Sequence, residues 1–274
     1  ADVLLEADQP NVEAMMNPCL IWLFALVLRA EKRTAINPWL LAGVLLGWAS
    51  LYKHITVAFF IALVIAHVGF PPLGDTRRQA VSQVGLMAAM SFLPWGVCAL
   101  YFFFFGSYHA FWETLFVYNR FYAGSMWQNV LNGLLPKNLF HDKMLSVLPL
   151  AVATLLGLVP WLWGAMTRVR ALFLAYILAV PIMVALPGKF YTHYYQLWLP
   201  VLAVGAAWML DDFQKWPVPS LFIRRGFGWL ILVLLLIAQG SYFRFSYMGW
   251  SQLKFGPRYI YTERTARQID RLHV

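Results

Sequence analysis

Ionisable and aromatic side chains interrupt apolar sequence at residues 188–196, which read Gly-Lys-Phe-Tyr-Thr-His-Tyr-Tyr-Gln. Lys189 and His193 can carry positive charge, and Tyr191 and Tyr194 offer hydroxyl donors and rings on which a ligand can stack. Tyrosines and a lysine are also typical of the aromatic belt at a membrane surface, where the lysine snorkels toward water. The stretch therefore has two interpretations, a ligand-binding patch and a plain interfacial belt.

Two further polar groups stand beside apolar runs. Asp8 precedes the first run and Glu13 opens it, while Lys53 and His54 separate the second run from the third. Glu13 is explained either by the favourable dipole of a helix N-terminus or by a functional pairing, because a carboxylate in apolar surroundings is costly. Lys53 is explained either as a snorkelling lysine at a hairpin tip or as a binding residue.

Together these residues suit chemistry on a phosphorylated lipid. Lysines bind phosphate, and a carboxylate acts as a general base or as a ligand of a divalent metal ion. The sequence contains no metal-binding motif, phosphate-binding loop, dinucleotide fingerprint or nucleophile elbow. It therefore gives no support to a soluble nucleotide donor, and it leaves a divalent metal ion open as a cofactor.

The composition is that of a membrane protein. Of the 274 residues, 61% are hydrophobic and 12% are charged, whereas a soluble domain carries about 25% charged residues. The net charge of +9 is spread over short basic clusters between apolar runs, as in loops of membrane proteins, so nucleic acid is not expected as a partner. Cys19 and Cys98 lie inside apolar runs and are expected to be packing residues.

Apolar runs near the length of about 20 residues that crosses a bilayer predict an all-α polytopic transmembrane bundle over residues 1–245. Eight spans are expected, at residues 13–28, 38–52, 55–69, 81–105, 147–166, 171–186, 195–210 and 227–242. Residues 106–145 are too polar to span and too aromatic for a free linker, so interfacial helices on the outer face are expected there. The tail, residues 246–274, is expected on the outer side.

The basic clusters between the spans give the orientation. If they share the cytoplasmic side, as the positive-inside rule requires, the alternation of eight spans is satisfied. The polar groups described above then all share the opposite, outer side. Glu13, Lys53, Lys189 and His193 are therefore predicted to approach one cavity on the outer face.

Three motifs carry a family resemblance. They are Asp-Gln-Pro-Asn-Val-Glu-Ala-Met-Met at residues 8–16, Leu-Ala-Gly-Val-Leu-Leu-Gly-Trp-Ala-Ser-Leu-Tyr-Lys at 41–53, and the aromatic-His-Tyr-Tyr pattern within 189–200. In these short motifs the chain resembles, from Asp8 to about Leu210, bacterial members of the dolichyl-phosphate-mannose protein mannosyltransferase superfamily. The resemblance implies a GT-C fold, related to that of the aminoarabinose transferases that modify lipid A.

The resemblance also implies a reaction, in which a polyprenyl-phosphate sugar donates its glycosyl group with inversion to an acceptor on the periplasmic or lumenal side. It matches Glu13 to an active-site acid and Lys53 to the lysine that closes the Gly-rich span, and Asp8 is taken as a second candidate catalytic acid. The family's first external loop, which carries a catalytic acid, has no counterpart in these residues. Further N-terminal spans are therefore expected in the full protein, and the chain by itself is expected to be inactive.

The predicted function is thus that of an inverting glycosyltransferase of the bacterial inner membrane, with a polyprenyl-phosphate sugar and membrane lipid as partners and an acceptor that the sequence does not identify. The residues predicted to bind substrate are Lys53, His54, Lys189, Tyr191, His193 and Tyr194. A polytopic transporter or lipid flippase is the alternative, because it would also bury ionisable residues in a bundle. Transporters usually show inverted repeats, and the sequence contains no internal repeat.

Overall fold

The computed structural model describes residues 11–30, 37–139, 142–215, 221–240, 249 and 258–271, and within these ranges it contains helices and no strand. The predicted all-helical class is confirmed. Four helices are long and apolar enough to cross a membrane, namely Val12–Arg29, Arg77–Phe104, Met144–Trp161 and Arg168–Ala185. They support the predicted membrane protein, while eight crossings stay a prediction.

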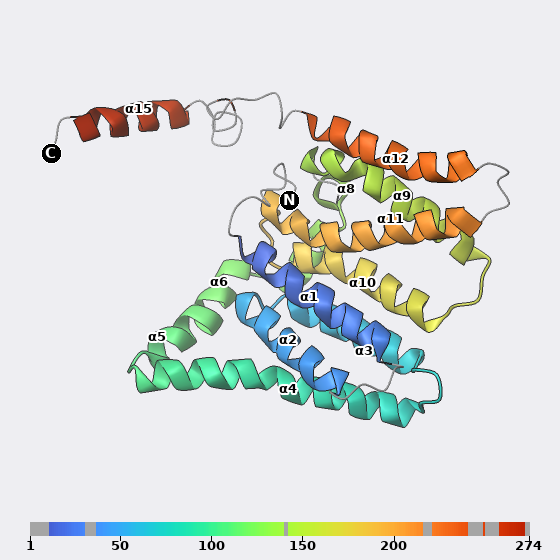
Figure 1. Cartoon of the computed structure of the whole chain (residues 1–274). Coiled ribbons are helices and arrows are strands. Elements are labelled where there is room, and N and C mark those ends of the chain that lie inside the picture. The colour runs from blue at the N-terminus through green and yellow to red at the C-terminus, as the bar shows by residue number, and fades with distance from the viewer. Residues whose placement is uncertain are drawn as a thin grey trace.

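The first four helices run in alternating directions (Figure 1). They are α1 (Val12–Arg29), α2 (Pro38–Tyr52), α3 (Thr56–Gly69) and α4 (Arg77–Phe104). The end of α1 therefore lies at the same end of the molecule as the start of α4. This end, with Arg29 and Arg77, is called the basic end below, and the opposite end is called the site end.

Side-chain caps fix where the helices of the basic end begin. Asn37 accepts a hydrogen bond from the Trp39 backbone at 3.0 Å, and Pro38 has the fixed φ that suits a first helical turn. Thr76 and Gln79 form a reciprocal capping box at the start of α4. These local signals fix the starts of α2 and α4 at the basic end.

Two glycines of α2 allow close packing against α4. A Cβ atom at Gly43 would lie 2.4 Å from the Met87 carbonyl oxygen, and one at Gly47 would lie 2.1 Å from that of Ser91. These distances are far below van der Waals contact, so the two backbones approach each other as in small-residue helix pairs of membranes. The packing holds the end of α2, and hence Lys53, against α4.

The main core surrounds α10 (Arg168–Ala185), in which ten of the 18 residues are buried, against three of 28 in α4. The centroid of the Tyr176 ring lies 5.2 Å from that of Phe24 and 4.7 Å from that of Phe59. These contacts join α10 to α1 and α3. At the basic end, Arg168 donates to the Val27 carbonyl oxygen at 2.8 Å. The core thus ties helices from both halves of the chain into one bundle.

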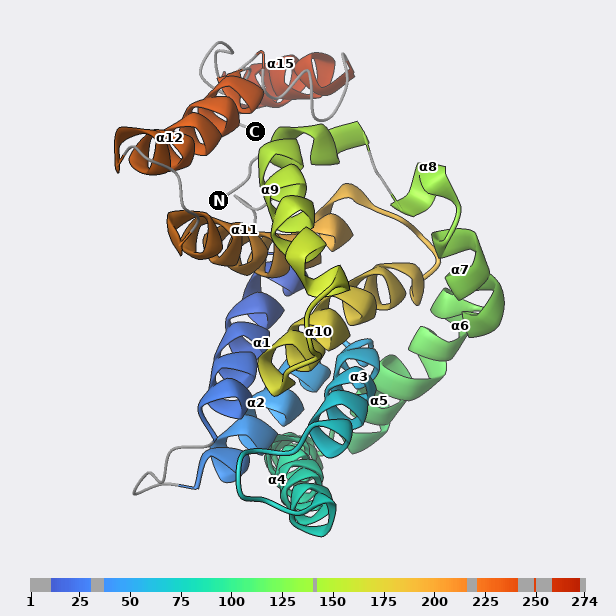
Figure 2. The same cartoon turned by 90° about the vertical axis from the view of Figure 1, so that its right-hand side faces the viewer.

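A second, smaller core lies between α9 (Leu148–Leu158), α11 (Trp198–Lys215) and α12 (Leu221–Ala238). The hydroxyl group of Thr154 in α9 donates to the Leu202 carbonyl oxygen in α11 at 2.9 Å. Figure 2 shows these helices on the side of the bundle away from α4.

Several predicted boundaries differ from the structure. The fifth span is a composite of the 3-10 helix η3 (Asp142–Val147), α9 and the 3-10 helix η4 (Val159–Leu162). The seventh begins at Trp198 and continues to Lys215, because no proline or glycine stops it at the acidic pair that was predicted to be a loop. The eighth begins at Leu221, six residues earlier than predicted.

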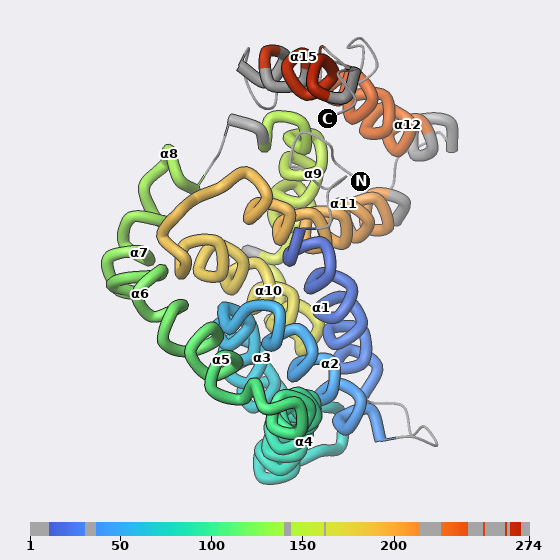
Figure 3. The backbone as a smooth tube through the Cα atoms, turned by 90° about the vertical axis from the view of Figure 1, so that its left-hand side faces the viewer, coloured from blue at the N-terminus to red at the C-terminus, as the bar shows by residue number. Residues whose placement is uncertain are grey.

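The segment at 106–145 is helical in its described part. It forms α5 (Tyr108–Trp112), the π-helix η2 (Glu113–Tyr118), α6 (Asn119–Ala123), α7 (Met126–Gly133) and α8 (Pro136–Leu139). Figures 2 and 3 show these elements along one side of the molecule. Its interfacial position stays a prediction, as does the outer location of the tail, of which α15 (Arg258–Arg271) is described.

Candidate functional site

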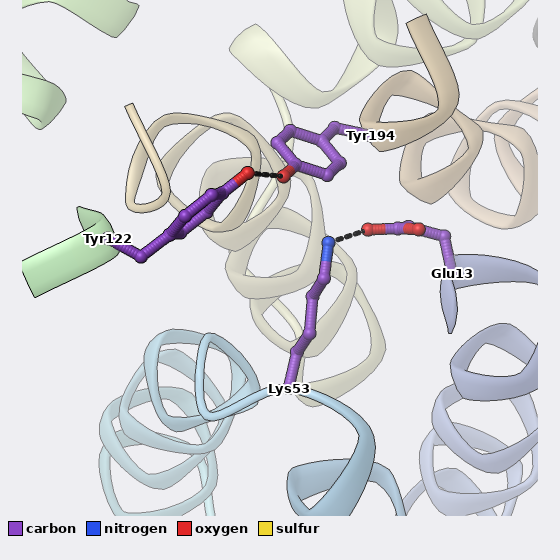
Figure 4. A network of polar contacts seen from close by, with 4 residues as sticks. All are labelled: Glu13, Lys53, Tyr122 and Tyr194. Atoms are coloured by element: carbon purple, nitrogen blue, oxygen red, sulfur yellow. Dashed lines mark hydrogen bonds and ion pairs between the residues drawn. The ribbon is translucent and has the colours of Figure 1, made fainter. Parts of the chain in front are cut away.

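A buried ion pair marks the site end. Glu13 lies in the first turn of α1 and Lys53 follows the last residue of α2, so the alternation of the helices brings them together. The Lys53 ammonium group donates to Oε1 of Glu13, as Figure 4 shows. The Glu13 side chain is 1% exposed and that of Lys53 is 22% exposed. A carboxylate as buried as this needs a partner, because burial of an unpaired charge is very unfavourable.

Two tyrosines extend the pair into a network of four side chains (Figure 4). The Lys53 Nζ atom lies 3.8 Å from the centroid of the Tyr194 ring, a cation–π contact. The hydroxyl oxygens of Tyr194 and Tyr122 are 3.4 Å apart. Tyr194 comes from the 3-10 helix η5 (Thr192–Leu197) and Tyr122 from α6. The network therefore joins four elements that are distant in the sequence.

Burial shifts the protonation equilibria of this network. It lowers the pKa of Lys53 from its usual value, and the charge and hydrogen bond of Glu13 oppose that shift. It also raises the pKa of Tyr194 above its usual range, with a further contribution from the hydrogen bond with Tyr122. Tyr194 is therefore a neutral hydroxyl group at physiological pH, and the charges of the network are those of Glu13 and Lys53.

A cavity of about 420 Å³ adjoins the network. Most of its lining is apolar, two of the lining side chains are permanent or near-permanent cations, Lys53 and Arg120, and none is a carboxylate. The residues that line it are Leu51, Tyr52, Lys53, His54, Ile55, Leu115, Phe116, Asn119, Arg120, Tyr122, Ala123, Gly124, Met126, Leu186, Pro187 and Tyr194. Such a lining suits a ligand that combines an anionic group with a hydrocarbon part.

His54 lines the same cavity within an aromatic cluster. Its ring centroid lies 5.3 Å from that of Trp95 and 5.5 Å from that of Phe116. Burial lowers the pKa of His54, so the imidazole is neutral near pH 7. Its Nε2 atom is buried and has no hydrogen-bond partner in the described part of the chain. His54 is therefore suited to a hydrogen bond with a polar ligand group rather than to binding a phosphate by charge.

Three of the predicted site residues, Lys53, His54 and Tyr194, line the cavity. Glu13 contacts Lys53 and is not among the lining residues. Lys189 is exposed and does not line the cavity either, but its Nζ atom lies 5.1 Å from the ring centroid of Tyr122, which does.

The other predicted residues lie further from the cavity or outside the described ranges. The ring centroid of His193 lies 4.7 Å from that of Tyr194. The ring of Tyr191 is half-exposed, and its centroid lies 5.6 Å from that of His193. Asp8 lies outside the described residues. Of the four residues predicted to share one cavity, Lys53 lines it. Glu13, Lys189 and His193 do not line it, and each contacts a residue that does.

No sequence pattern by itself marks Asn119, Arg120 or Tyr122 as site residues. They lie in the aromatic stretch 116–122, Phe-Val-Tyr-Asn-Arg-Phe-Tyr, within the segment predicted to be interfacial. An arginine between aromatic residues was the available signal. Its meaning depends on α6 lying across the site end, which no local pattern specifies.

The described residues do not fit a divalent metal ion. No group of three or more histidine, cysteine, aspartate and glutamate side chains within these ranges could hold one. Glu13, the carboxylate of the network, accepts a hydrogen bond from Lys53.

The network and the cavity together form an amphiphilic site at one end of a helical bundle. Its apolar wall can hold hydrocarbon, and its cations can hold an anion. Comparison of the chain with protein-family models, curated proteins and solved structures finds no match.

Proposed function

We propose that the chain is part of an inverting glycosyltransferase that takes its sugar from a polyprenyl-phosphate donor, and that the cavity holds the phosphate and the first prenyl units. The observation that carries the proposal is an apolar cavity with Lys53 and Arg120 in its lining and no carboxylate. A lipid phosphate has the matching chemistry, an anion joined to a long hydrocarbon. The proposal includes a GT-C-like bundle of eight spans in a bacterial inner membrane, with the site end on the outer side.

The reaction forms a bond between an acceptor oxygen and C1 of the sugar and breaks the bond between C1 and the phosphate oxygen. The lipid phosphate leaves with the electron pair of the broken bond and gains negative charge. Lys53 and Arg120 would stabilise that charge, which is the usual way in which fixed cations accelerate such a step. The acceptor proton passes to a base, for which the family resemblance suggests the catalytic acid of the family's first external loop.

Glu13 is assigned a positioning role. Its Oε1 atom accepts the Lys53 hydrogen bond, and its charge opposes the loss of the lysine proton that burial favours. Glu13 would thus keep Lys53 protonated and directed at the cavity. Tyr194, whose ring lies against the ammonium group, restricts Lys53 from another side.

The test is a binding comparison with the purified protein in nanodiscs. Polyprenyl phosphate and the uncharged polyprenol of the same length are titrated against wild type, Lys53→Met and Arg120→Gln. Wild type is expected to bind the phosphate at least tenfold more tightly than the alcohol, about 1.4 kcal/mol or more. Each variant is expected to lose about tenfold in phosphate affinity, because a charge-assisted contact is removed, and to keep its alcohol affinity.

Lys137→Gln is the matched control, because Lys137 is an exposed cation on α8 that does not line the cavity. It is expected to bind the phosphate as wild type does. Equal affinity for phosphate and alcohol, or an equal loss in all three variants, would contradict the proposed site. Glycosyl transfer by the full-length protein is the second readout, and Lys53→Met is expected to reduce it strongly.

A further inference from the structure

The cavity lies between two parts of the molecule. One part, called the body, contributes residues 51–55, Leu186, Pro187 and Tyr194. The other, called the arm, is the continuous helical stretch 108–123 formed by α5, η2 and α6. The arm contributes six lining residues, Leu115, Phe116, Asn119, Arg120, Tyr122 and Ala123. Any movement of the arm away from the body would open the cavity.

Glycines with positive φ flank the arm. Gly106 has φ 67° and Gly124 has φ 66°, a backbone region that is open mainly to glycine. No atom lies within 4 Å of a Cβ built at either position, so packing does not hold these two residues in place. After the arm, the chain is held where Asn129 of α7 donates to the Leu186 carbonyl oxygen at 2.9 Å. Before the arm, α4 packs against α2 near Met87 and Ser91, and its last turn, with Phe104, is exposed. Rotation can therefore concentrate at the two glycines.

Few polar contacts hold the arm in place. One is the hydrogen bond that the Asn129 amide donates to the Ala123 carbonyl oxygen at 2.6 Å across Gly124, which rotation at this glycine must break or bend. Phe116 joins the rings of His54 and Trp95, and Tyr122 contacts the hydroxyl group of Tyr194 and lies under Lys189. No ion pair joins arm and body in the described ranges. The pair His109–Glu113, at 3.4 Å, lies within the arm. The contacts between the arm and the body are few and partly exposed, so they can separate and re-form at a lower cost than those of the buried core around α10.

The two cations of the cavity come from opposite sides, Lys53 from the body and Arg120 from the arm. Because Glu13 already pairs with Lys53, the like charges of Lys53 and Arg120 oppose closure only weakly when no anion lies between them. An anion that contacts both removes this repulsion and adds attraction on each side. A ligand can shift a conformational equilibrium only through such a difference in affinity between the two states.

We propose that the arm is a lid, seen here in its closed position, which opens by rotation about Gly106 and Gly124 and which a bound amphiphilic anion closes. The exposed apolar side chains of the arm, Trp112, Val117 and Phe121, suit it to move against lipid. The identity of the anion as a lipid phosphate rests on the proposed function. The hinged arm itself depends only on the contacts and backbone described above.

The test measures the distance between spin labels on the arm and on the body by pulsed electron resonance in nanodiscs. Labels replace Phe121 and Leu73, which are 80% and 94% exposed, in a chain with Cys19 and Cys98 changed to serine. Tyr122→Ala removes the contacts with Tyr194 and Lys189. It is expected to raise the population of the second, open distance by about fivefold or more. Polyprenyl phosphate is expected to restore the closed distance in this variant, whereas polyprenol is not.

Tyr108→Ala is the matched control, a tyrosine of the same arm whose ring contact, with Phe111, stays within the arm. It is expected to leave the distances unchanged. Tyr122→Phe keeps the ring and is expected to give an intermediate open population if Tyr122→Ala folds poorly. A single distance that is the same in wild type, Tyr122→Ala and Tyr122→Phe would overturn the lid, even if the lipid phosphate binds. If Tyr122→Ala opens the arm but the phosphate neither binds nor closes it, the lid stands and the proposed donor is wrong.

Discussion

The substitution Lys53→Met tests the buried ion pair on which the site is built. It leaves Glu13, which is 1% exposed, without its cation. Breaking a buried pair in this way typically costs about 3–5 kcal/mol. Because Lys53 is 22% exposed, water reaches its side of the pair, and we expect a value near the lower limit, about 3 kcal/mol. For a chain of this size that corresponds to a fall in Tm of about 6–12 °C.

The double variant Lys53→Met/Glu13→Leu distinguishes a lost pair from lost packing. Replacing both partners by apolar side chains leaves no unpaired charge, and such replacements are often neutral or stabilising. The double variant is therefore expected to recover most of the stability that Lys53→Met loses. The coupling energy between the two positions is expected to be about 2 kcal/mol or more.

Thermal unfolding of the purified protein in detergent, followed by tryptophan fluorescence, measures these differences. The chain offers an internal control in the exposed pair His109–Glu113, whose side chains are 87% and 58% exposed. Glu113→Gln is expected to change stability by less than about 1 kcal/mol, as surface pairs do. The reasoning is refuted if Lys53→Met unfolds at the same temperature as Glu113→Gln, or if the double variant is no more stable than Lys53→Met.

Three further predictions concern packing, the anchoring of the segment after the arm, and pH. Gly47→Ala is expected to lower stability by about 1–3 kcal/mol by forcing α2 from α4, whereas Gly96→Ala, in open space on α4, should stabilise slightly; equal melting temperatures would contradict this. Asn129→Ala loses hydrogen bonds to two carbonyl oxygens and is expected to cost about 1–3 kcal/mol, with faster hydrogen exchange at residues 126–133. Burial lowers the pKa of Lys53 below its unfolded value of 10.5, so the folded state binds the lysine proton less tightly than the unfolded state does. The stability of the protein is therefore expected to rise as pH increases toward that value. Glu13→Gln lowers the pKa further, so its stability should rise more than that of wild type between pH 7 and 9.5, and equal slopes in a denaturant titration would count against the pairing.

Much of the architecture follows from hydropathy. The helical class, the positions of α1, α2, α3 and α10 and the turns between them were predictable, because apolar runs and caps act locally. The boundaries of α11 and α12 were not, because both helices continue through charged residues at which loops were predicted, and Gly226 does not interrupt α12.

The sequence by itself determined that charged residues sit at helix ends, because a charge inside an apolar run is costly, and alternation of the helices then brings Glu13 and Lys53 to one end. Only the tertiary structure decided which of these charges meet. Lys189 lies over Tyr122 rather than in the cavity, and Arg120 enters the cavity wall because α6 folds back across the body. The physical reason is that these contacts join segments about 65 to 70 residues apart through aromatic rings and hydroxyl groups. Such contacts depend on the path of the whole chain and leave no periodic pattern in the sequence.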